Sequence, residues 1–307
     1  MRHLQTLRMI EDVARAGSIR RAAEAMHLTA SALNRRIQNF EAEFGAPIFE
    51  RLPRGVRLNP AGELLLHHIR TQRADLARVR SQVADLSGER RGVVTIACSQ
   101  GLLPYFLPRE IAAYRAEHPG VGFRVLVRDR AAAERELSAF AADLAVVYEP
   151  AFMADFEIVA SARQPVQAIM APDHPLAARP DLRLRECLDW PHAVPETETG
   201  VRHLLDLALR GSSRRLAPAV VSDSFEFLRH YVLHERLVSF QIPVGLTEAQ
   251  RAGLIARPLP ARDVPPGHLI LGHQRGRTLP VAAARFADRL AATLAAMAAD
   301  ETPSASR

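Results

Sequence analysis

The chain contains no lysine, so all 40 of its Lys and Arg residues are arginines, in a sequence of 307 residues. Alanine is abundant, and both features are typical of codon usage in a GC-rich genome. Hydrophobic residues make up 48% and charged residues 24% of the sequence. These fractions are ordinary for a globular protein and exclude disordered and collagen-like chains. At this length we expect two or more domains.

Cysteine and long hydrophobic runs are also scarce. The two cysteines, Cys98 and Cys187, lie far apart and form no CxxC motif, which excludes a disulfide framework and a zinc ribbon. No uncharged run reaches the roughly 18 residues that a membrane span needs, and residues 1–7 lack the apolar core of a signal peptide. We therefore expect a soluble, cytoplasmic protein that does not contact a membrane.

Signatures of catalysis and of cofactor binding are missing. The sequence has no GxSxG elbow, Walker loop or zincin motif. His230 and His234 stand four residues apart, but no third metal ligand is suggested nearby. A redox pair of Cys98 and Cys187 would require two thiols from different elements, one in a strand and one in a helix, to come together. We expect no catalytic residue, no metal and no cofactor, so the chain is not predicted to be an enzyme.

The net positive charge belongs to the first part of the chain. Residues 1–92 hold 16 arginines against 10 acidic residues, whereas the remainder holds 24 of each, so the formal charge of +6 arises before residue 93. Clustered positive charge attracts phosphate backbones. The asymmetry indicates a module that binds a polyanion, joined to a neutral module.

Three short helices are predicted within residues 1–60. Apolar residues recur at helical spacing from Leu4 to Val13, and Gly17 is suited to end that helix. Ser18 and Thr29 can cap the two helices that follow. The tight turn between the second and third helices predicts a helix-turn-helix.

The third helix has a polar face that suits double-stranded DNA. Leu33, Ile37 and Phe40 form its buried stripe, so hydroxyl, amide and guanidinium groups lie outward, where they can read base edges in a major groove. A solvated face without a partner is the alternative.

Two short strands around a Pro/Gly turn then predict a wing whose arginines can contact phosphates or a narrow minor groove. The predicted DNA-binding residues are Ser18, Thr29, Ala30, Ser31, Asn34, Arg35, Arg36, Gln38, Arg51, Arg54 and Arg57.

A long helix is predicted from Pro60 to about Leu86, with Asn59 as its cap. Its apolar residues recur at heptad spacing over about three heptads, which is typical of a coiled-coil seam. Packing against its own domain is the alternative. The predicted dimerisation residues are Leu65, Ile69, Leu76, Val79, Val83 and Leu86.

Residues 93–307 alternate between strand and helix patterns, which predicts α/β domains with largely parallel sheets. Strands are expected at residues 93–98, 121–127, 143–148, 156–160, 166–171, 218–222, 237–241 and 269–272, and helices at 109–117, 131–142, 201–209, 225–234 and 281–297.

Polar residues that follow these strands are candidates for a ligand site, because ligands bind at the carboxyl ends of strands or between lobes. Helix caps or surface loops are the alternative for each of them. Their joint position favours a small polar effector, with a carboxylate as one candidate. Glu196, Glu198 and Asp223 would instead favour an amine. The predicted effector-binding residues are Ser99, Gln100, Gly101, Arg128, Tyr148, Thr197, Thr199, Ser222 and Asp223.

Together these motifs resemble LysR-type transcriptional regulators. The N-terminal winged helix-turn-helix is indicated by GSIRRAA (17–23), LTASALNRRI (28–37), FER (49–51) and LNPAG (58–62). The effector domain is indicated by LP (103–104), AEHPG (116–120), ADLAVV (142–147), DHPL (173–176) and VRHLL (201–205). Residues 29–31 and Asn34 depart from the Ser-Gln-Pro and Ser of many members, and residues 234–237 lack the usual glycine-containing turn.

The resemblance implies an α/β chain with three parts. These are a winged helix-turn-helix at residues 1–60, a linker helix at 61–90 that pairs two copies into dimers or tetramers, and an effector domain at 91–307. The effector domain would have the type 2 periplasmic-binding-protein-like fold, with lobe I at residues 93–161 and 268–307 and lobe II at 162–267. We therefore expect a DNA-binding transcriptional regulator that responds to a small molecule held between the lobes. The alternative is a solute-binding protein or enzyme on a two-lobed fold with a non-functional N-terminal domain.

Overall fold

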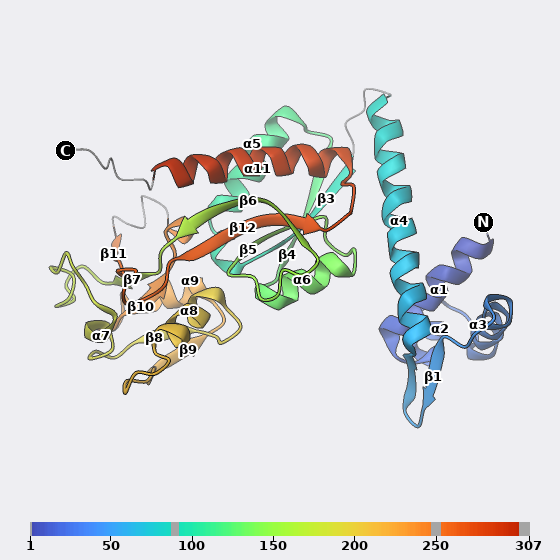
Figure 1. Cartoon of the computed structure of the whole chain (residues 1–307), viewed down its shortest axis with the longest axis horizontal. Helices are drawn as coiled ribbons and strands as arrows, with labels where there is room; N and C mark the ends of the chain where they lie inside the picture. Colours follow the sequence, from blue (N-terminus) through green and yellow to red (C-terminus); the bar gives the residue numbers. More distant parts are fainter. Residues whose placement is uncertain (1, 87–91, 247–252, 301–307) are drawn as a thin grey trace. The chain divides into compact units, whose positions relative to one another are not determined.

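The computed structural model describes residues 2–86, 92–246 and 253–300. Contacts between residues divide the chain into two units, Met1–Ala77 and Arg78–Arg307. The first unit is helical with one small hairpin, and the second is mixed α/β (Figure 1).

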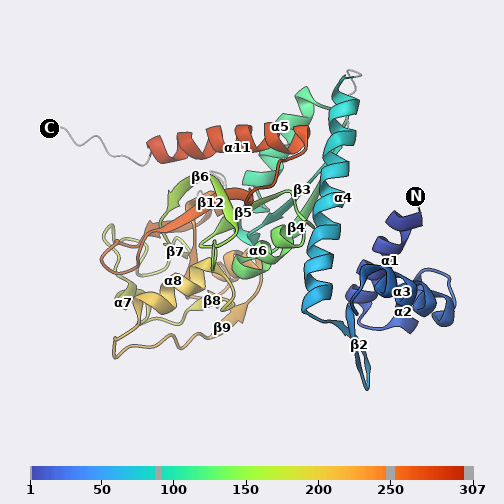
Figure 2. The same ribbon diagram turned by 45° about the vertical axis from the view of Figure 1, so that its right-hand side comes forward.

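The first unit begins with three helices and a hairpin, followed by a long helix. These are α1 (Arg2–Ala16), α2 (Ile19–Ala25), α3 (Ala30–Phe44), β1 (Phe49–Leu52), β2 (Gly55–Leu58) and α4 (Pro60–Leu86). Ser18 accepts a hydrogen bond from the N–H of Arg21, and Thr29 accepts one from the N–H of Ala32, so both predicted caps are confirmed. The hairpin projects beyond the helices of this unit (Figure 2). The predicted winged helix-turn-helix is therefore confirmed.

The second unit contains a five-stranded sheet in the order β4-β3-β5-β12-β6. Its strands are β3 (Gly92–Cys98), β4 (Val121–Val127), β5 (Leu144–Tyr148), β6 (Phe156–Gln164) and β12 (Gly267–Gln274), and its helices are α5 (Phe106–Glu117), α6 (Arg130–Ser138) and α11 (Val281–Asp300). Helices α5 and α11 cover one face and α6 covers the other (Figure 1). Alternate residues of β5 point to opposite faces, so Leu144 and Val146 pack under α11 whereas Ala145 and Val147 pack under α6. We call this part lobe I.

The remaining elements form lobe II. A three-stranded sheet has the order β10-β7-β11, and a second sheet pairs β8 with β9. The strands are β7 (Gln167–Met170), β8 (Ala193–Pro195), β9 (Val220–Ser222), β10 (Ser239–Gln241) and β11 (Ile255–Pro258), with helices α7 (Leu184–Cys187), α8 (Gly200–Ala208) and α9 (Phe225–Tyr231). Short 3-10 turns, η1 (Gln100–Leu102) and η2 (Pro243–Gly245), follow β3 and β10.

The prediction of largely parallel sheets is wrong, because four of the seven strand pairings among the described residues of the second unit are antiparallel. β3 is parallel to β4 and β5, but β12 is antiparallel to both of its neighbours, and β7 is antiparallel to β10 and β11. Strand β12 returns from lobe II into lobe I beside β6, which makes it run opposite to the strands before it. The short elements α7, β8 and β11 were not predicted.

Two predicted helices end early for local reasons. The helix predicted over residues 131–142 ends at Ser138, because Phe140 adopts a left-handed conformation with φ of 54°. The helix predicted to reach His234 ends at Tyr231. Tight turns follow it, in which the N–H groups of Leu233 and His234 donate to the backbone oxygens of His230 and Tyr231. No residue from Val232 to Leu237 in this described stretch has a positive φ, so the turn needs no glycine.

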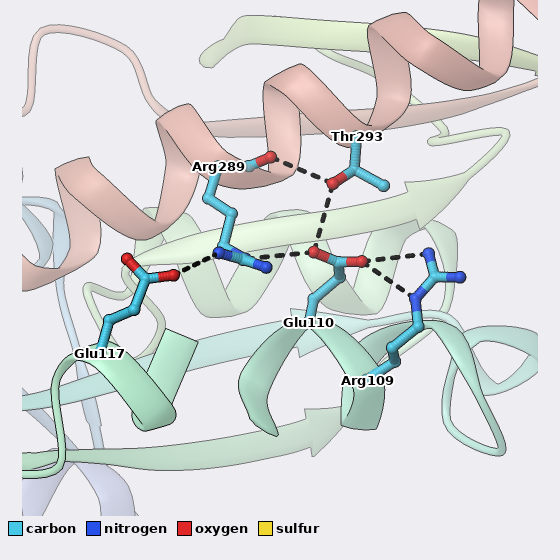
Figure 3. Close-up of polar contacts among 5 residues, drawn as sticks. All are labelled: Arg109, Glu110, Glu117, Arg289 and Thr293. Atoms are coloured by element: carbon cyan, nitrogen blue, oxygen red, sulfur yellow. Dashed lines mark hydrogen bonds and ion pairs between the residues drawn. The ribbon is translucent and has the colours of Figure 1, made fainter. Parts of the chain in front are cut away.

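Helices α5 and α11 of lobe I are joined by a buried carboxylate (Figure 3). Glu110 is 4% exposed and accepts hydrogen bonds from Arg289 at 3.3 Å and Thr293 at 3.2 Å, both on α11. Arg109 binds its other oxygen, and Arg289 also reaches Glu117 at the surface. The network therefore links α11 to α5 through polar contacts, beside the apolar contact of Tyr114 with Phe286.

In the part of the chain that the structure describes, no helix combines the length and hydrophobicity that crossing a lipid bilayer requires.

Candidate functional site

Helix α3 presents a polar stripe on its exposed side. Ser31, Arg35 and Gln38 are exposed and Asn34 is partly exposed, while Leu33, Ile37 and Phe40 are buried beneath them. These spacings place the four polar residues on one side of the helix. Ala30 is also exposed at the first turn. The stripe therefore carries hydroxyl, amide and guanidinium groups, which are hydrogen-bond donors and acceptors of the kinds that suit base edges.

Three predicted DNA-binding residues have local partners. The side chains of Ser18 and Thr29 accept the capping hydrogen bonds of α2 and α3. Arg36 contacts the sulfur of Met9 on α1 at 3.6 Å and lines a groove of about 790 Å³ between α1 and α2. Arg36 therefore lies on the flank of α3, beside the stripe.

The wing carries its three arginines in different settings. Arg51 of β1 donates to the amide oxygen of Asn34 on α3 at 3.3 Å. Arg57 of β2 forms an ion pair with Glu50 at 2.8 Å. Arg54 is exposed in the turn between the strands. The structure thus brings the wing into direct contact with the polar stripe of α3.

The predicted dimerisation seam of α4 divides into two parts. Leu65 and Ile69 are buried in the core of the first unit with Leu7, Ile10, Phe40 and Ile48. Their assignment to a seam between two copies is corrected, because a side chain held in its own domain cannot face a partner helix. Leu76, Val79 and Val83 are 41%, 44% and 58% exposed. The side chain of Leu86 lies outside the described part.

Gln100 joins the two lobes of the second unit. Its side-chain amide donates to the backbone oxygen of Asp223 at 2.5 Å, and its side-chain oxygen accepts from the N–H of Phe225 at 2.6 Å. Both partners belong to lobe II, at the start of α9. The next residue, Gly101, faces Gln241 and Ile242 of lobe II. Two groups of predicted effector-binding residues, those that follow β3 and those at 222–223, therefore lie close to each other.

Tyr148 packs between elements of both lobes. Its hydroxyl donates to the backbone oxygen of Gln164 at 2.8 Å, and its N–H donates to the Ser99 hydroxyl at 3.1 Å. A Cβ at Gly200 would lie 2.4 Å from the Tyr148 carbonyl oxygen, and one at Gly267 would lie 2.0 Å from its hydroxyl. Only glycine fits at these two positions, so Tyr148 packs in the junction between the lobes.

Four other predicted effector residues have separate surroundings. Arg128 is paired at 2.6 Å with Glu136 on α6 of lobe I. Thr199 caps α8 and also donates to the backbone oxygen of Glu196, whereas Thr197 is exposed. The hydroxyl of Ser222 accepts from the N–H of Ser224.

Sequence reasoning missed three ionisable groups at the junction. Burial raises the pKa of Asp129, against hydrogen bonds from the Ser99 side chain and the Gln100 N–H that lower it. Burial lowers the pKa of Arg130, which donates to the Glu149 backbone oxygen at 2.7 Å. Burial also lowers the pKa of His203 on α8, and the charge of Arg130 adds to that effect. Asp129 and Arg130 directly follow Arg128, which the strand-end pattern had singled out, so the pattern pointed to a neighbouring residue of the same segment.

Groups that would support redox or metal chemistry are not assembled in the described residues. Cys98 and Cys187 are free and buried. Across residues 2–86, 92–246 and 253–300, no three His, Cys, Asp or Glu side chains are grouped as metal ligands would be.

Comparison with known proteins covers both units. Residues 4–63 match the bacterial regulatory helix-turn-helix protein family of lysR type, and residues 87–295 match the LysR substrate binding domain. A RuBisCO operon transcriptional regulator of Allochromatium vinosum is 32% identical over 203 residues, which are 66% of this chain and 67% of that protein.

Solved structures share the fold. Full-length OxyR from Pseudomonas aeruginosa has a TM-score of 0.67 at 21% identity, with 94% of each chain covered. Full-length CbnR complexed with its target DNA has a TM-score of 0.60 at 16% identity, covering 93% of this chain and 98% of that one. The effector-domain match alone spans more than half of the sequence. The chain therefore belongs to the LysR family of transcriptional regulators.

Proposed function

We propose that this regulator binds operator DNA through the stripe on α3 and the arginines of the wing. The observation that carries the proposal is the exposed line of Ser31, Arg35 and Gln38 above a fully buried apolar stripe. Their donors and acceptors suit base edges, and the exposed Arg54 suits the phosphate backbone. Ser18, Thr29 and Ala30 would position the first turns of α2 and α3 against that backbone. Arg36 would contribute charge from the flank.

The parts of the chain take separate roles in this proposal. Residues 1–60 bind DNA, residues 61–90 connect, and residues 91–307 hold the effector, with lobe I at 93–161 and 268–307 and lobe II at 162–267. In this proposal the protein would act in the cytoplasm as a regulator and not as an enzyme. The structure separates two units between Ala77 and Arg78, within α4, and the separate sheets of the second unit support its division into two lobes.

A second copy of the chain would pair along the later turns of α4. Leu76, Val79 and Val83 recur at helical spacing and expose a large part of their apolar surface. Burying them against the same residues of another copy removes this surface from water. Homodimers, which can assemble further into tetramers, follow from this pairing.

The effector would bind at the junction between the lobes, where side chains from both lobes meet. Arg130 of lobe I and His203 of lobe II lie close enough to interact electrostatically. The side chains of Gln100 and Arg128, two of the predicted effector-binding residues, have partners within the chain. A ligand that favours one arrangement of the lobes over another would change how dimers hold DNA.

Replacing Arg35 with alanine tests the recognition stripe. If Arg35 reads a base, Arg35→Ala should weaken operator binding by roughly 1 to 3 kcal/mol. Arg262→Ala is the control, because it also removes one exposed positive charge but lies in lobe II. Binding of both full-length variants can be measured by fluorescence anisotropy at one fixed salt concentration. Equal affinities for Arg35→Ala and the unchanged protein would remove Arg35 from the site.

A further inference from the structure

The two faces of the wing differ in charge and in their neighbours. In the β1–β2 hairpin, Glu50 stands opposite Arg57, and Arg51 stands opposite Val56. Successive residues of a strand point to opposite faces, so the Glu50–Arg57 ion pair occupies one face and Arg51 shares the other with Val56. Val56 packs against the core beneath α2 and α3. The face that carries Arg51 is therefore turned towards the recognition helix.

Arg51 uses this position to hold the side-chain amide of Asn34. Its guanidinium donates to the Asn34 Oδ1 at 3.3 Å. An amide has one oxygen that accepts and one nitrogen that donates, so a cation at the oxygen orients the whole group. The positive charge of Arg51 therefore lies beside the Asn34 oxygen, which leaves the Asn34 nitrogen as the end of the amide that can donate.

This orientation changes which base the pair can recognise. Asparagine reads adenine with both ends of its amide, because its oxygen accepts from the adenine N6 amino group while its nitrogen donates to N7. With Arg51 at the oxygen, one of its two lone pairs is occupied and a positive charge lies beside it, so the guanidinium and the amide nitrogen face the base as donors and a base amino group is disfavoured there. Guanine is the base whose major-groove edge offers two acceptors, N7 and O6, without a donor of its own.

We infer that Arg51 and Asn34 act as one unit that selects guanine in the operator, with Arg51 determining the specificity of Asn34. The inference rests on the proposed binding of DNA by the α3 stripe. It assigns to Arg51 a role in sequence recognition in addition to contact with phosphates, and it separates Arg51 from Arg57, whose charge is already matched by Glu50.

Selection from a duplex library with randomised sequence tests this inference with the full-length chain. The unchanged protein should enrich a motif with guanine at the position read by Asn34, preferred over adenine by about tenfold. Arg51→Ala should lose most of that preference and move towards adenine at the same position, because both ends of the Asn34 amide become available. Asn34→Ala should locate the position by abolishing discrimination there.

Arg57→Ala is the matched control, since it removes an arginine from the opposite face of the same hairpin. Because Arg57 is itself one of the wing arginines proposed to contact DNA, this variant is expected to bind more weakly overall, but it should retain the preference for guanine over adenine at the Asn34 position. If Arg51→Ala binds too weakly for selection, competition at low salt between duplexes that differ only by guanine or adenine at that position gives the same ratio.

An unchanged guanine preference in Arg51→Ala, or adenine selected by the unchanged protein, overturns the inference and leaves the proposed DNA binding intact. A library from which the unchanged protein enriches no motif contradicts the proposed DNA-binding function itself.

Discussion

At the scale of single residues, burial decides the chemistry of the two thiols. Burial raises the pKa of Cys98 to about 12, with a further contribution from the charge of Asp129. Burial raises the pKa of Cys187 to about 12 as well, with Glu186 adding to it. Both thiols therefore stay protonated near neutral pH, which makes them poor nucleophiles and poor redox centres. They serve as small apolar side chains of the core.

The raised thiol pKa values predict how stability depends on pH. A thiol that ionises near pH 9 when unfolded and near pH 12 when folded favours the folded chain fully below pH 9. Its contribution is lost as pH rises from 9 to 12, at up to about 1.4 kcal/mol per pH unit for each thiol. Urea unfolding at pH 8 and pH 10 should show this loss. The loss should be smaller in Cys187→Ala, and an equal loss in both proteins would contradict the assignment.

At the scale of elements, the Glu110 network predicts unequal costs for two neighbouring carboxylates. Glu110→Ala should lower the free energy of unfolding by about 2 kcal/mol, because it removes the shared acceptor of Arg289 and Thr293 (Figure 3). Glu117→Ala removes an exposed partner of the same arginine and should cost less than about 1 kcal/mol. Urea unfolding of both variants measures the difference. Equal costs would show that α5 and α11 do not depend on the buried carboxylate.

Elements that depend on local signals were predicted well from the sequence. Caps such as Ser18 and Thr29 act within a few residues, so the helices of the first unit and the wing were found. The direction of β12 depends on a strand more than 100 residues away, β6, and local patterns do not carry that information. Heptad spacing shows that a helix face is apolar but not what covers it, which is why Leu65 and Ile69 were assigned to a partner.

The candidate site was predicted in part for the same reason. Exposed donors on α3 follow directly from helical periodicity, whereas the partners of polar residues after the strands depend on the other lobe. Gln100 is the clearest case, because its side chain forms hydrogen bonds with Asp223 and Phe225, which lie 123 and 125 positions further along the chain. Outside the candidate site, the burial of Glu110 could not be predicted either. A lone acidic residue in a helical pattern is typical of a surface position, and Glu110 is buried only because α11 covers it.

At the scale of the whole molecule, the structure combines a DNA-binding unit with a two-lobed unit whose lobes share an apolar core and are also linked by polar contacts. Gln100 links the end of β3 in lobe I to the start of α9 in lobe II, and Tyr148 fills the space between α8 and β12. Movement of one lobe against the other must disturb these contacts. They are therefore where a ligand at the junction would affect the arrangement of the lobes.

The most direct test of the regulator function is a footprint of the full-length chain on the DNA that flanks its own gene. A symmetric dimer of winged helix-turn-helix units should protect an interrupted palindrome at moderate salt, because each half of the palindrome meets one copy of α3. Protection of two half-sites about one helical turn, or a multiple of a turn, apart is the predicted result. Absence of protection on this DNA at moderate salt would contradict the account.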